Sequence, residues 1–285
     1  MDQLQVRAKD GTRIVCWDFG GGGEPVLMLH GTGLHGRCWA AVARSLAEGF
    51  RPLALDMRGH GASGRSPDGS YAWELFAADT LAVADQLGLA GAPGLTAVGH
   101  SAGATALLLA EAARPGTFSR LWAWEPIVAI PEGALTARHS TVLAGSARRR
   151  RARFASLEEA RAHFAGRGQF AEFSAASMEA FLEGAFVPTD DGGIRLACEP
   201  EDEARMYEAA LTNNAWGLLG EVRCPTRVLG GGRSGGVPAD DLAKVLSRLP
   251  AGELKVMAAR GHFGPFAAPV EVAGDIASQA AATPT

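Results

Sequence analysis

Along most of the chain, short apolar runs typical of strands alternate with segments in which apolar residues have helical spacing. This alternation predicts the order of the strands and helices. Residues 4–19 contain two β-rich stretches around the turn sequence KDG, which predicts a hairpin. Short apolar runs typical of buried parallel strands follow at residues 26–31, 51–59, 95–101 and 120–126. Between them, helical spacing of apolar residues predicts helices at residues 37–50, 71–91 and 102–116. This order predicts a mostly parallel central sheet with helices on both faces.

The pattern changes after Pro126. The following segment is rich in Ala, Arg and Phe, has helical spacing, and contains no run typical of a buried strand. The strand–helix alternation then returns, with strands predicted around 226–230 and in ELKVMAA, and helices at 238–249 and 269–281. We therefore predict an α/β core formed by residues 1–128 and 217–285, and a helical cap formed by residues 129–216.

Composition and charge narrow the classes of function. The 285 residues suffice for a large core with an insert, and the net charge of −4 gives no reason to expect nucleic acid as a partner. The polar N-terminus and the lack of a long apolar run predict a cytoplasmic protein without membrane contact. The four cysteines have no metal-ligand spacing, and no phosphate loop or dinucleotide fingerprint occurs, so we expect neither a metal nor a cofactor. The oligomeric state stays open, with a homodimer among the alternatives.

The sequence GHSAG places Ser101 between two glycines, where a predicted strand ends and a predicted helix begins. In such a sharp turn, a Cβ at Gly99 or Gly103 would clash with neighbouring backbone, and the serine hydroxyl is exposed above the sheet edge. The turn also aims the Ala102 N–H and the positive end of the helix at the group that the hydroxyl attacks. The context therefore predicts a nucleophilic serine.

Four motifs spread over the chain resemble those of the α/β-hydrolase fold superfamily. GHSAG matches its G-x-S-x-G nucleophile elbow, and LHGTG at residues 29–33 resembles its oxyanion loop. LDMRGHGAS at residues 55–63 resembles a mainly structural stretch, and GHFGPF near the C-terminus resembles the loop that carries the catalytic histidine. The resemblance implies an α/β-hydrolase fold with a cap inserted after strand six. It also implies an oxyanion hole formed by the backbone N–H groups of Thr32 and Ala102.

A serine hydroxyl becomes a good nucleophile when an imidazole removes its proton, so one of the seven histidines should serve as the base. Six of them lie in backbone motifs, in neighbouring loops or in the predicted cap: His30, His35, His60, His100, His139 and His163. His262 follows the last predicted core strand, in the chain order serine, acid, histidine that this fold uses. We predict that His262 is the base.

The position of the acidic residue that should orient the histidine departs from the commonest family pattern. That pattern has an aspartate after the seventh strand. Here Ser234 stands at that position, and Asp240 and Asp241 come later, where a helix-capping role suits them better. Some members, including haloalkane dehalogenases and zearalenone lactonases, instead use a glutamate after the sixth strand, and Glu125 occupies that place. Burying an unpaired carboxylate there would be costly, so we expect Glu125 to orient His262. The alternative is a structural glutamate bonded to backbone or to an arginine.

The predicted cap supplies many aromatic side chains, some of which should face the active-site cleft. The predicted pocket residues are Gly31, Trp39, His100, Phe173, Phe181, Trp216 and Phe263. The run RRRRAR at residues 148–153 is interpreted as an exposed helix face rather than a substrate site.

These features predict a serine hydrolase that cleaves a carboxylic ester or lactone of an apolar small molecule through an acyl-enzyme. The glutamate position together with HFGPF resembles the zearalenone lactonases, which implies a macrolactone as one substrate class. A serine at the elbow argues against dehalogenase or epoxide-hydrolase chemistry, because those relatives use an aspartate there. Two alternatives stay open: C–C bond hydrolysis or cofactor-free lyase or cyclase chemistry on the same fold, and a ligand receptor with slow turnover.

Overall fold

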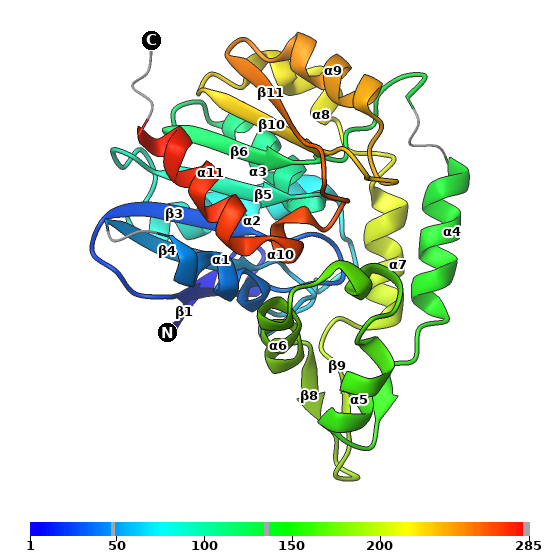
Figure 1. The fold of residues 1–285 in the computed structure, drawn as a ribbon. Coiled ribbons are helices and arrows are strands. Elements are labelled where there is room, and N and C mark those ends of the chain that lie inside the picture. Colours follow the sequence, from blue (N-terminus) through cyan, green and yellow to red (C-terminus); the bar gives the residue numbers. More distant parts are fainter. Residues whose placement is uncertain (47–48, 134–136, 282–285) are drawn as a thin grey trace.

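An eight-stranded sheet forms the centre of the computed structural model, which describes residues 1–46, 49–133 and 137–281 (Figure 1). The strand order is β1-β2-β4-β3-β5-β6-β10-β11. The first two strands form the predicted antiparallel hairpin, β2 also pairs antiparallel with β4, and all further neighbours are parallel. The bounds are β1 (Asp2–Arg7), β2 (Arg13–Asp18), β3 (Glu24–Leu29), β4 (Phe50–Asp56), β5 (Thr96–His100), β6 (Arg120–Trp124), β10 (Thr226–Gly231) and β11 (Gly252–Met257).

Helices cover both faces of this sheet, as the alternation of strand and helix patterns in the sequence predicts. On one face α1 packs against α11, and on the other α2 packs against α3 (Figure 1). A large apolar cluster lies on each face. The predicted fold class, a mostly parallel sheet flanked by helices, is confirmed. The helices are η1 (Gly36–Trp39), α1 (Ala40–Ser45), α2 (Trp73–Gln86), α3 (Ala102–Ala113), α8 (Ala215–Leu218), η3 (Leu219–Glu221), α9 (Ala239–Arg248), α10 (Gly264–Ala267) and α11 (Pro269–Ala281).

The segment between β6 and α8 lies to the right of and below the sheet in Figure 1 and contains a small sheet as well as helices. Its strands are antiparallel, in the order β7-β9-β8, so the expectation of a purely helical cap is wrong in this respect. Strands of two or three residues are too short to show a period-2 pattern in sequence. The elements are α4 (Ala137–Arg148), β7 (Arg153–Phe154), α5 (Leu157–Phe164), η2 (Gly168–Glu172), α6 (Ala175–Gly184), β8 (Phe186–Pro188), β9 (Ile194–Leu196) and α7 (Pro200–Ala209).

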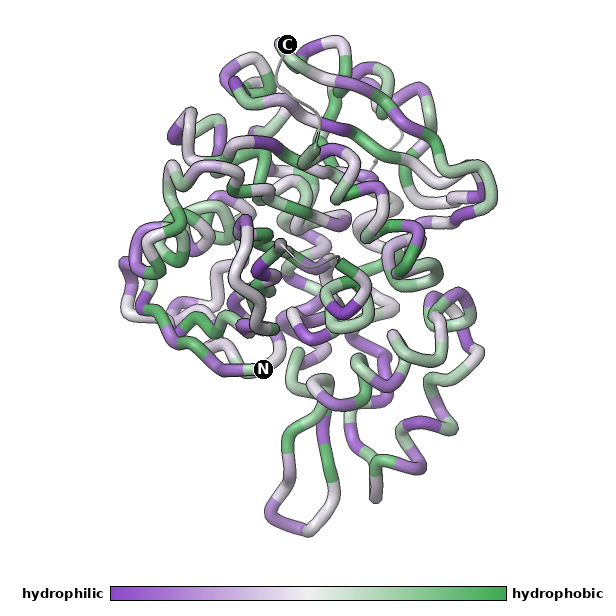
Figure 2. Tube along the Cα trace, turned by 60° about the vertical axis from the view of Figure 1, so that its left-hand side comes forward, coloured by the Kyte–Doolittle hydropathy of each residue, from purple (hydrophilic) through white to green (hydrophobic). Residues whose placement is uncertain are grey.

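Apolar residues are concentrated in the central strands, whereas the loop at the tip of the β8–β9 hairpin is polar (Figure 2). All four cysteines are buried and free. No helix among the described residues combines the length and apolarity needed to cross a bilayer. The predicted boundaries at residues 128 and 217 stay predictions, and residues 134–136 of the predicted cap lie outside the described part.

The parallel strands place the motif residues at a single edge. β3, β5, β6, β10 and β11 run in the same direction, so their carboxyl ends meet there, and ligands of open α/β sheets bind outside this edge. The loops after these strands carry Gly31, Ser101, Glu125, Ser234 and His262. Five segments that are far apart in sequence therefore converge on one site.

Candidate active site

Ser101 occupies the sharp turn between β5 and α3. Its backbone has φ 54° and ψ −120°, a conformation that costs energy in a non-glycine residue and is typical of functional sites. A Cβ at Gly99 would lie 2.6 Å from the backbone nitrogen of Ala104, and one at Gly103 would lie 2.6 Å from the carbonyl oxygen of Leu29. Both glycines are therefore required by close backbone approach, as the motif predicts.

Glu125 and His262 meet through their side chains. Glu125 follows β6, is fully buried and has φ 43°, and His262 lies in the loop between β11 and α10. The distance from His262 Nδ1 to Glu125 Oε2 is 2.6 Å. The indole N–H of Trp124 donates to the carbonyl oxygen of His262 at 2.8 Å and so anchors this loop to β6. The structure thus brings the predicted base and the predicted acid together.

The loop after β10 holds the Glu125 carboxylate in place. The backbone N–H of Gly231 donates to Oε1 at 2.8 Å, and the Ser234 hydroxyl donates to Oε2 at 2.7 Å. Burial alone would raise the pKa of Glu125, but the hydrogen bonds from His262, Gly231 and Ser234 outweigh it and lower that pKa. Glu125 is therefore ionised at neutral pH and can only accept hydrogen bonds.

Sequence reasoning missed this role of Ser234. Its only signal was a hydroxyl at the position where most family members have an aspartate, and the structure shows that the hydroxyl supports the relocated acid. Asp240 and Asp241 lie in the first turn of α9, where Asp241 Oδ1 pairs with Lys244 Nζ at 3.0 Å. The helix cap is Pro238, so the expectation that these aspartates cap α9 is wrong.

The loop after β3, which carries the predicted oxyanion donor Thr32, lies beside Ser101. A Cβ at Gly31 would lie 3.1 Å from Ser101 Cβ, so this loop passes directly beside the serine. The Gly33 N–H donates to His60 Nε2 at 3.1 Å, which is possible because burial lowers the pKa of His60 to about 4 and keeps the ring neutral. Among the described residues, nothing accepts from the N–H groups of Thr32 and Ala102, which leaves both available to a ligand.

The Ser101 hydroxyl makes no hydrogen bond within the described part of the chain, so its contact to the base is not closed in this structure. Such catalytic hydrogen bonds are often long without substrate and tighten in the reacting complex. The imidazole of His262 nevertheless lies beside the elbow, with its ring centre 4.8 Å from that of the adjacent His100. No group of side chains suited to holding a metal ion occurs in the described ranges.

Aromatic side chains from core and cap meet next to His262. Phe263 lies 5.9 Å from Phe173 between ring centres, and the ring of His100 lies 5.5 Å from that of Phe263. Phe181 and Trp39 belong to the same apolar cluster, in which both are buried. The structure therefore brings these five predicted pocket residues into one region, with Gly31 at its core side.

Trp216 does not join this group. Its ring lies 4.6 Å from the guanidinium carbon of Arg248, the last residue of α9, and it packs against the apolar cluster on the other face of the sheet. α9 connects two parallel strands, so it runs from the carboxyl edge back toward the amino edge. Trp216 thus lies away from Ser101, and its assignment to the pocket is corrected: its spacing in the chain did not show which face of the sheet α8 covers.

Known proteins share both the sequence pattern and the fold. A sequence model of the alpha/beta hydrolase family matches residues 26–275. The chain is 41% identical over 100 residues to the bifunctional esterase/perhydrolase DCH of Acinetobacter calcoaceticus, and 38% identical over 99 residues to a non-heme haloperoxidase of Rhodococcus erythropolis. Each match covers 34% of this chain and about a third of the relative, 35% and 34% respectively.

Two solved structures resemble the whole chain. That of E-2-(acetamidomethylene)succinate hydrolase has a TM-score of 0.81 and 21% identity, covering 97% of this chain and 98% of the other. The esterase EaEST of Exiguobacterium antarcticum has a TM-score of 0.78 and 19% identity, covering 99% and 100%. At these identities the likeness shows the shared fold. Because the family pattern extends over most of the chain and the sheet and elbow are those of the fold, the chain belongs to the alpha/beta hydrolase family.

Proposed function

We propose that this protein is a serine hydrolase that cleaves a carboxylic ester or lactone of an apolar small molecule. Family membership and the esterase among its relatives support a hydrolase. The observation that carries the finer proposal is the 2.6 Å contact between His262 Nδ1 and a fully buried Glu125, next to the strained turn at Ser101. A buried carboxylate that only accepts fixes the imidazole tautomer, which leaves Nε2 as the base.

The proposed reaction proceeds in two halves. Ser101 Oγ attacks the carbonyl carbon while His262 Nε2 takes the hydroxyl proton, and Glu125 stabilises the imidazolium through Nδ1–H. The N–H groups of Thr32 and Ala102 stabilise the oxyanion of the tetrahedral intermediate. Its collapse expels the alkoxide, which takes the proton from His262 and leaves an acyl-Ser101 ester. Water, deprotonated by His262, then attacks this ester, and the acid is released with Ser101 restored.

An apolar substrate is supported by the aromatic rings around the proposed base. Phe173 stacks on Phe266 with ring centres 5.3 Å apart, and Phe263 lies 5.0 Å from the ring of His262. Rings in such a cluster bind alkyl or aryl groups. The acyl or alcohol part of the substrate would lie against them.

Turnover of nitrophenyl acetate and butyrate, combined with labelling by a fluorophosphonate, tests the proposal. We expect hydrolysis and a single covalent label in the wild type, and neither in Ser101→Ala. Labelling without turnover of any ester or lactone would instead support the slow receptor or the non-hydrolytic chemistry. Hydrolysis that survives Ser101→Ala at the wild-type rate would contradict the proposal.

A further inference from the structure

β11 forms one edge of the central sheet. It stands at the end of the strand order, with β10 on one side and no strand of the described chain on the other (Figure 1). Five of its six residues are exposed. An edge strand of this kind presents a row of unpaired backbone N–H and C=O groups that can pair with a strand of another chain. β11 is therefore a candidate surface for contact with a second protein chain.

The outward backbone groups of β11 belong to Gly252, Leu254 and Val256. The N–H of Gly232, directly after β10, donates to the carbonyl oxygen of Met257 at 3.0 Å, so the Met257 carbonyl faces β10. Because successive residues of a strand direct their N–H and C=O groups to opposite sides, the even-numbered residues of β11 face away from β10. No side chain of the described ranges bonds the backbone of these three residues, which leaves it open to another strand.

The opposite edge of the sheet is covered by the chain itself. Gln86 of α2 donates to the carbonyl oxygen of Arg7 at 2.8 Å and accepts from the Arg7 N–H at 3.3 Å, which satisfies the last residue of β1. Soluble proteins commonly cover or blunt an edge strand to prevent unwanted pairing. The two edges therefore differ, because β11 has no such cover in the part of the chain that the structure describes.

The apolar side chains of β11 extend beyond the helix on their face. A Cβ at Gly252 would lie 2.9 Å from the Cβ of Leu249, directly after α9, so Gly252, Leu254 and Val256 point to the face that α9 covers. Leu254 is nevertheless 37% exposed and Val256 53% exposed. Exposed apolar side chains beside unpaired backbone groups are typical of a strand that pairs with another chain.

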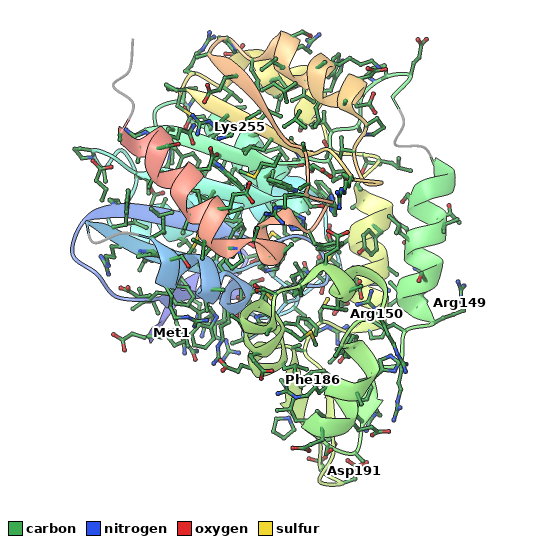
Figure 3. All side chains as sticks on the ribbon, viewed as in Figure 1. Met1, Arg149, Arg150, Phe186, Asp191 and Lys255 are labelled. Carbon is green, nitrogen blue, oxygen red and sulfur yellow. The ribbon has the colours of Figure 1, made fainter. Side chains whose placement is uncertain are left out.

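The charged side chains of β11 point to the other face and have opposite signs. Lys255 forms an ion pair with Asp275 of α11, and Glu253 forms one with Arg227 of β10. These partners hold both side chains against the α11 face, clear of the outward edge; Figure 3 labels Lys255. An acid and a base thus lie one residue to either side of Leu254, and a strand with this arrangement is complementary to a second copy of itself.

We propose that β11 pairs antiparallel with β11 of a second copy of this chain, about a twofold axis at Leu254, so that two sheets become one. In this register Leu254 lies opposite Leu254 of the second copy, Gly252 lies opposite Val256, and Glu253 lies opposite Lys255. Centring the pair on Glu253 or on Lys255 would instead place like charges opposite each other, which is destabilising. Each copy has one free side of β11, so the assembly closes at two chains.

The register also matches the free backbone groups. Leu254 directs its N–H and C=O outward, so it can form the hydrogen-bonded central pair, and the whole ladder contains about six hydrogen bonds. Leu254 and Val256 of both copies come together on the α9 face, which removes exposed apolar surface from water. The cap elements α5 and α6 lie at the far end of the molecule from β11 in Figure 1, so the pairing leaves them free.

Sedimentation velocity of the full chain over a range of concentrations tests the proposal. We expect a wild-type dimer, and Leu254→Lys should raise its dissociation constant by about 10-fold or more, because two ammonium groups then face each other in place of an apolar contact. Val142→Lys, a change at a 60% exposed residue of α4, should leave that constant unchanged. A wild type that stays monomeric, or a dimer that Leu254→Lys does not weaken, would overturn the proposal.

Disulfide formation between two variants tests the register. Directly opposite residues of a pair without mutual hydrogen bonds have Cα atoms about 4.5 Å apart, within reach of a disulfide, and the native cysteines are buried. Under mild oxidation, Glu253→Cys mixed with Lys255→Cys should form covalent dimers to a greater extent than either variant alone, and Val142→Cys should form few. Equal cross-linking in each variant alone, or none in the mixture, would overturn the proposal. The proposed active-site residues take no part, so neither result depends on the proposed hydrolase activity.

Discussion

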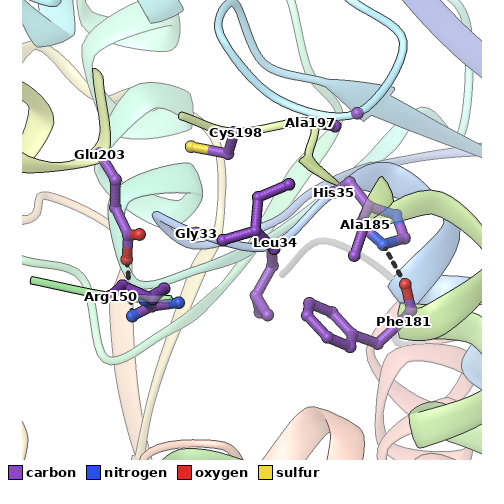
Figure 4. Close-up of a pocket in the computed structure, with 11 residues that line it drawn as sticks. Gly33, Leu34, His35, Arg150, Phe181, Ala185, Ala197, Cys198 and Glu203 are labelled. Carbon is purple, nitrogen blue, oxygen red and sulfur yellow. Dashed lines mark hydrogen bonds and ion pairs between the residues drawn. The ribbon is translucent and has the colours of Figure 1, made fainter. Parts of the chain in front are cut away.

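Two glutamates are equally buried in this protein and differ in almost everything else. Glu125 receives hydrogen bonds from His262, Gly231 and Ser234, whereas Glu203 pairs with the Arg150 guanidinium at 2.9 Å (Figure 4) and bonds the side chain of Tyr207. Burial raises the pKa of both carboxyls; hydrogen bonds and the His262 ring reverse the shift for Glu125, but the charge of Arg150 and the hydrogen bond of Tyr207 do not fully offset it for Glu203. Burial alone therefore does not decide what a carboxylate does. The groups that contact the carboxylate decide the direction of its pKa shift.

The largest expected effect on kcat comes from changing Glu125, which accepts hydrogen bonds from His262, Gly231 and Ser234. Glu125→Gln should lower kcat by about 10³- to 10⁴-fold, because an amide cannot hold the Nδ1–H tautomer or stabilise the imidazolium. Asp240→Asn, a matched change in the first turn of α9, should leave kcat within about twofold. Steady-state kinetics on one ester checks both, and a large loss in Asp240→Asn with little in Glu125→Gln would move the acid to the α9 side.

Removing a single hydrogen-bond donor to Glu125 should lower kcat less than Glu125→Gln does. Ser234→Ala takes one hydrogen bond from the charged Glu125 carboxylate, and we expect kcat to fall by about 10-fold. The pKa of Glu125 should rise, because the anion loses support, so thermal unfolding at several pH values should show its contribution to stability lost at a higher pH. Ser247→Ala, on the exposed side of α9, is the control and should change neither quantity.

The two glutamates should also give opposite pH dependences of stability. The lowered pKa of Glu125 stabilises the fold above the ordinary glutamate pKa, and this contribution is lost as the pH falls through the lowered value. The raised pKa of Glu203 has the reverse effect, because ionisation of Glu203 costs stability as the pH rises above the ordinary value. With rising pH, Glu125→Gln should therefore lose Tm relative to the wild type and Glu203→Gln should gain it, each by about 2 °C or more. Thermal unfolding at several pH values measures both, and parallel trends would contradict the comparison.

The sequence alone predicted most of the features that depend on local pattern or on the order of motifs along the chain. The turn at Ser101 could be predicted because the two glycines, the strand and the helix are neighbours in sequence. Glu125 and His262 are 137 residues apart, and they were paired through the resemblance to family members that place a glutamate after the sixth strand. Parallel strands fix which loops share an edge, so position along the fold substitutes for contact information.

The features that could not be predicted depend on contacts between distant segments. Arg150 is part of a charged run that is exposed elsewhere, and only the end of α4 at Arg148 turns it toward Gly33. Trp216 has the large aromatic side chain expected of a pocket residue, but its location depends on which face of the sheet α8 covers. The three cap strands are too short for any periodicity.

A crystal structure of the protein after reaction with a fluorophosphonate tests the central claim most directly. The account predicts phosphorus bonded to Ser101 Oγ, with one phosphonyl oxygen accepting from the N–H groups of both Thr32 and Ala102, and His262 still seated on Glu125. Phosphorus on another side chain, or an oxygen directed away from these two N–H groups, would contradict it.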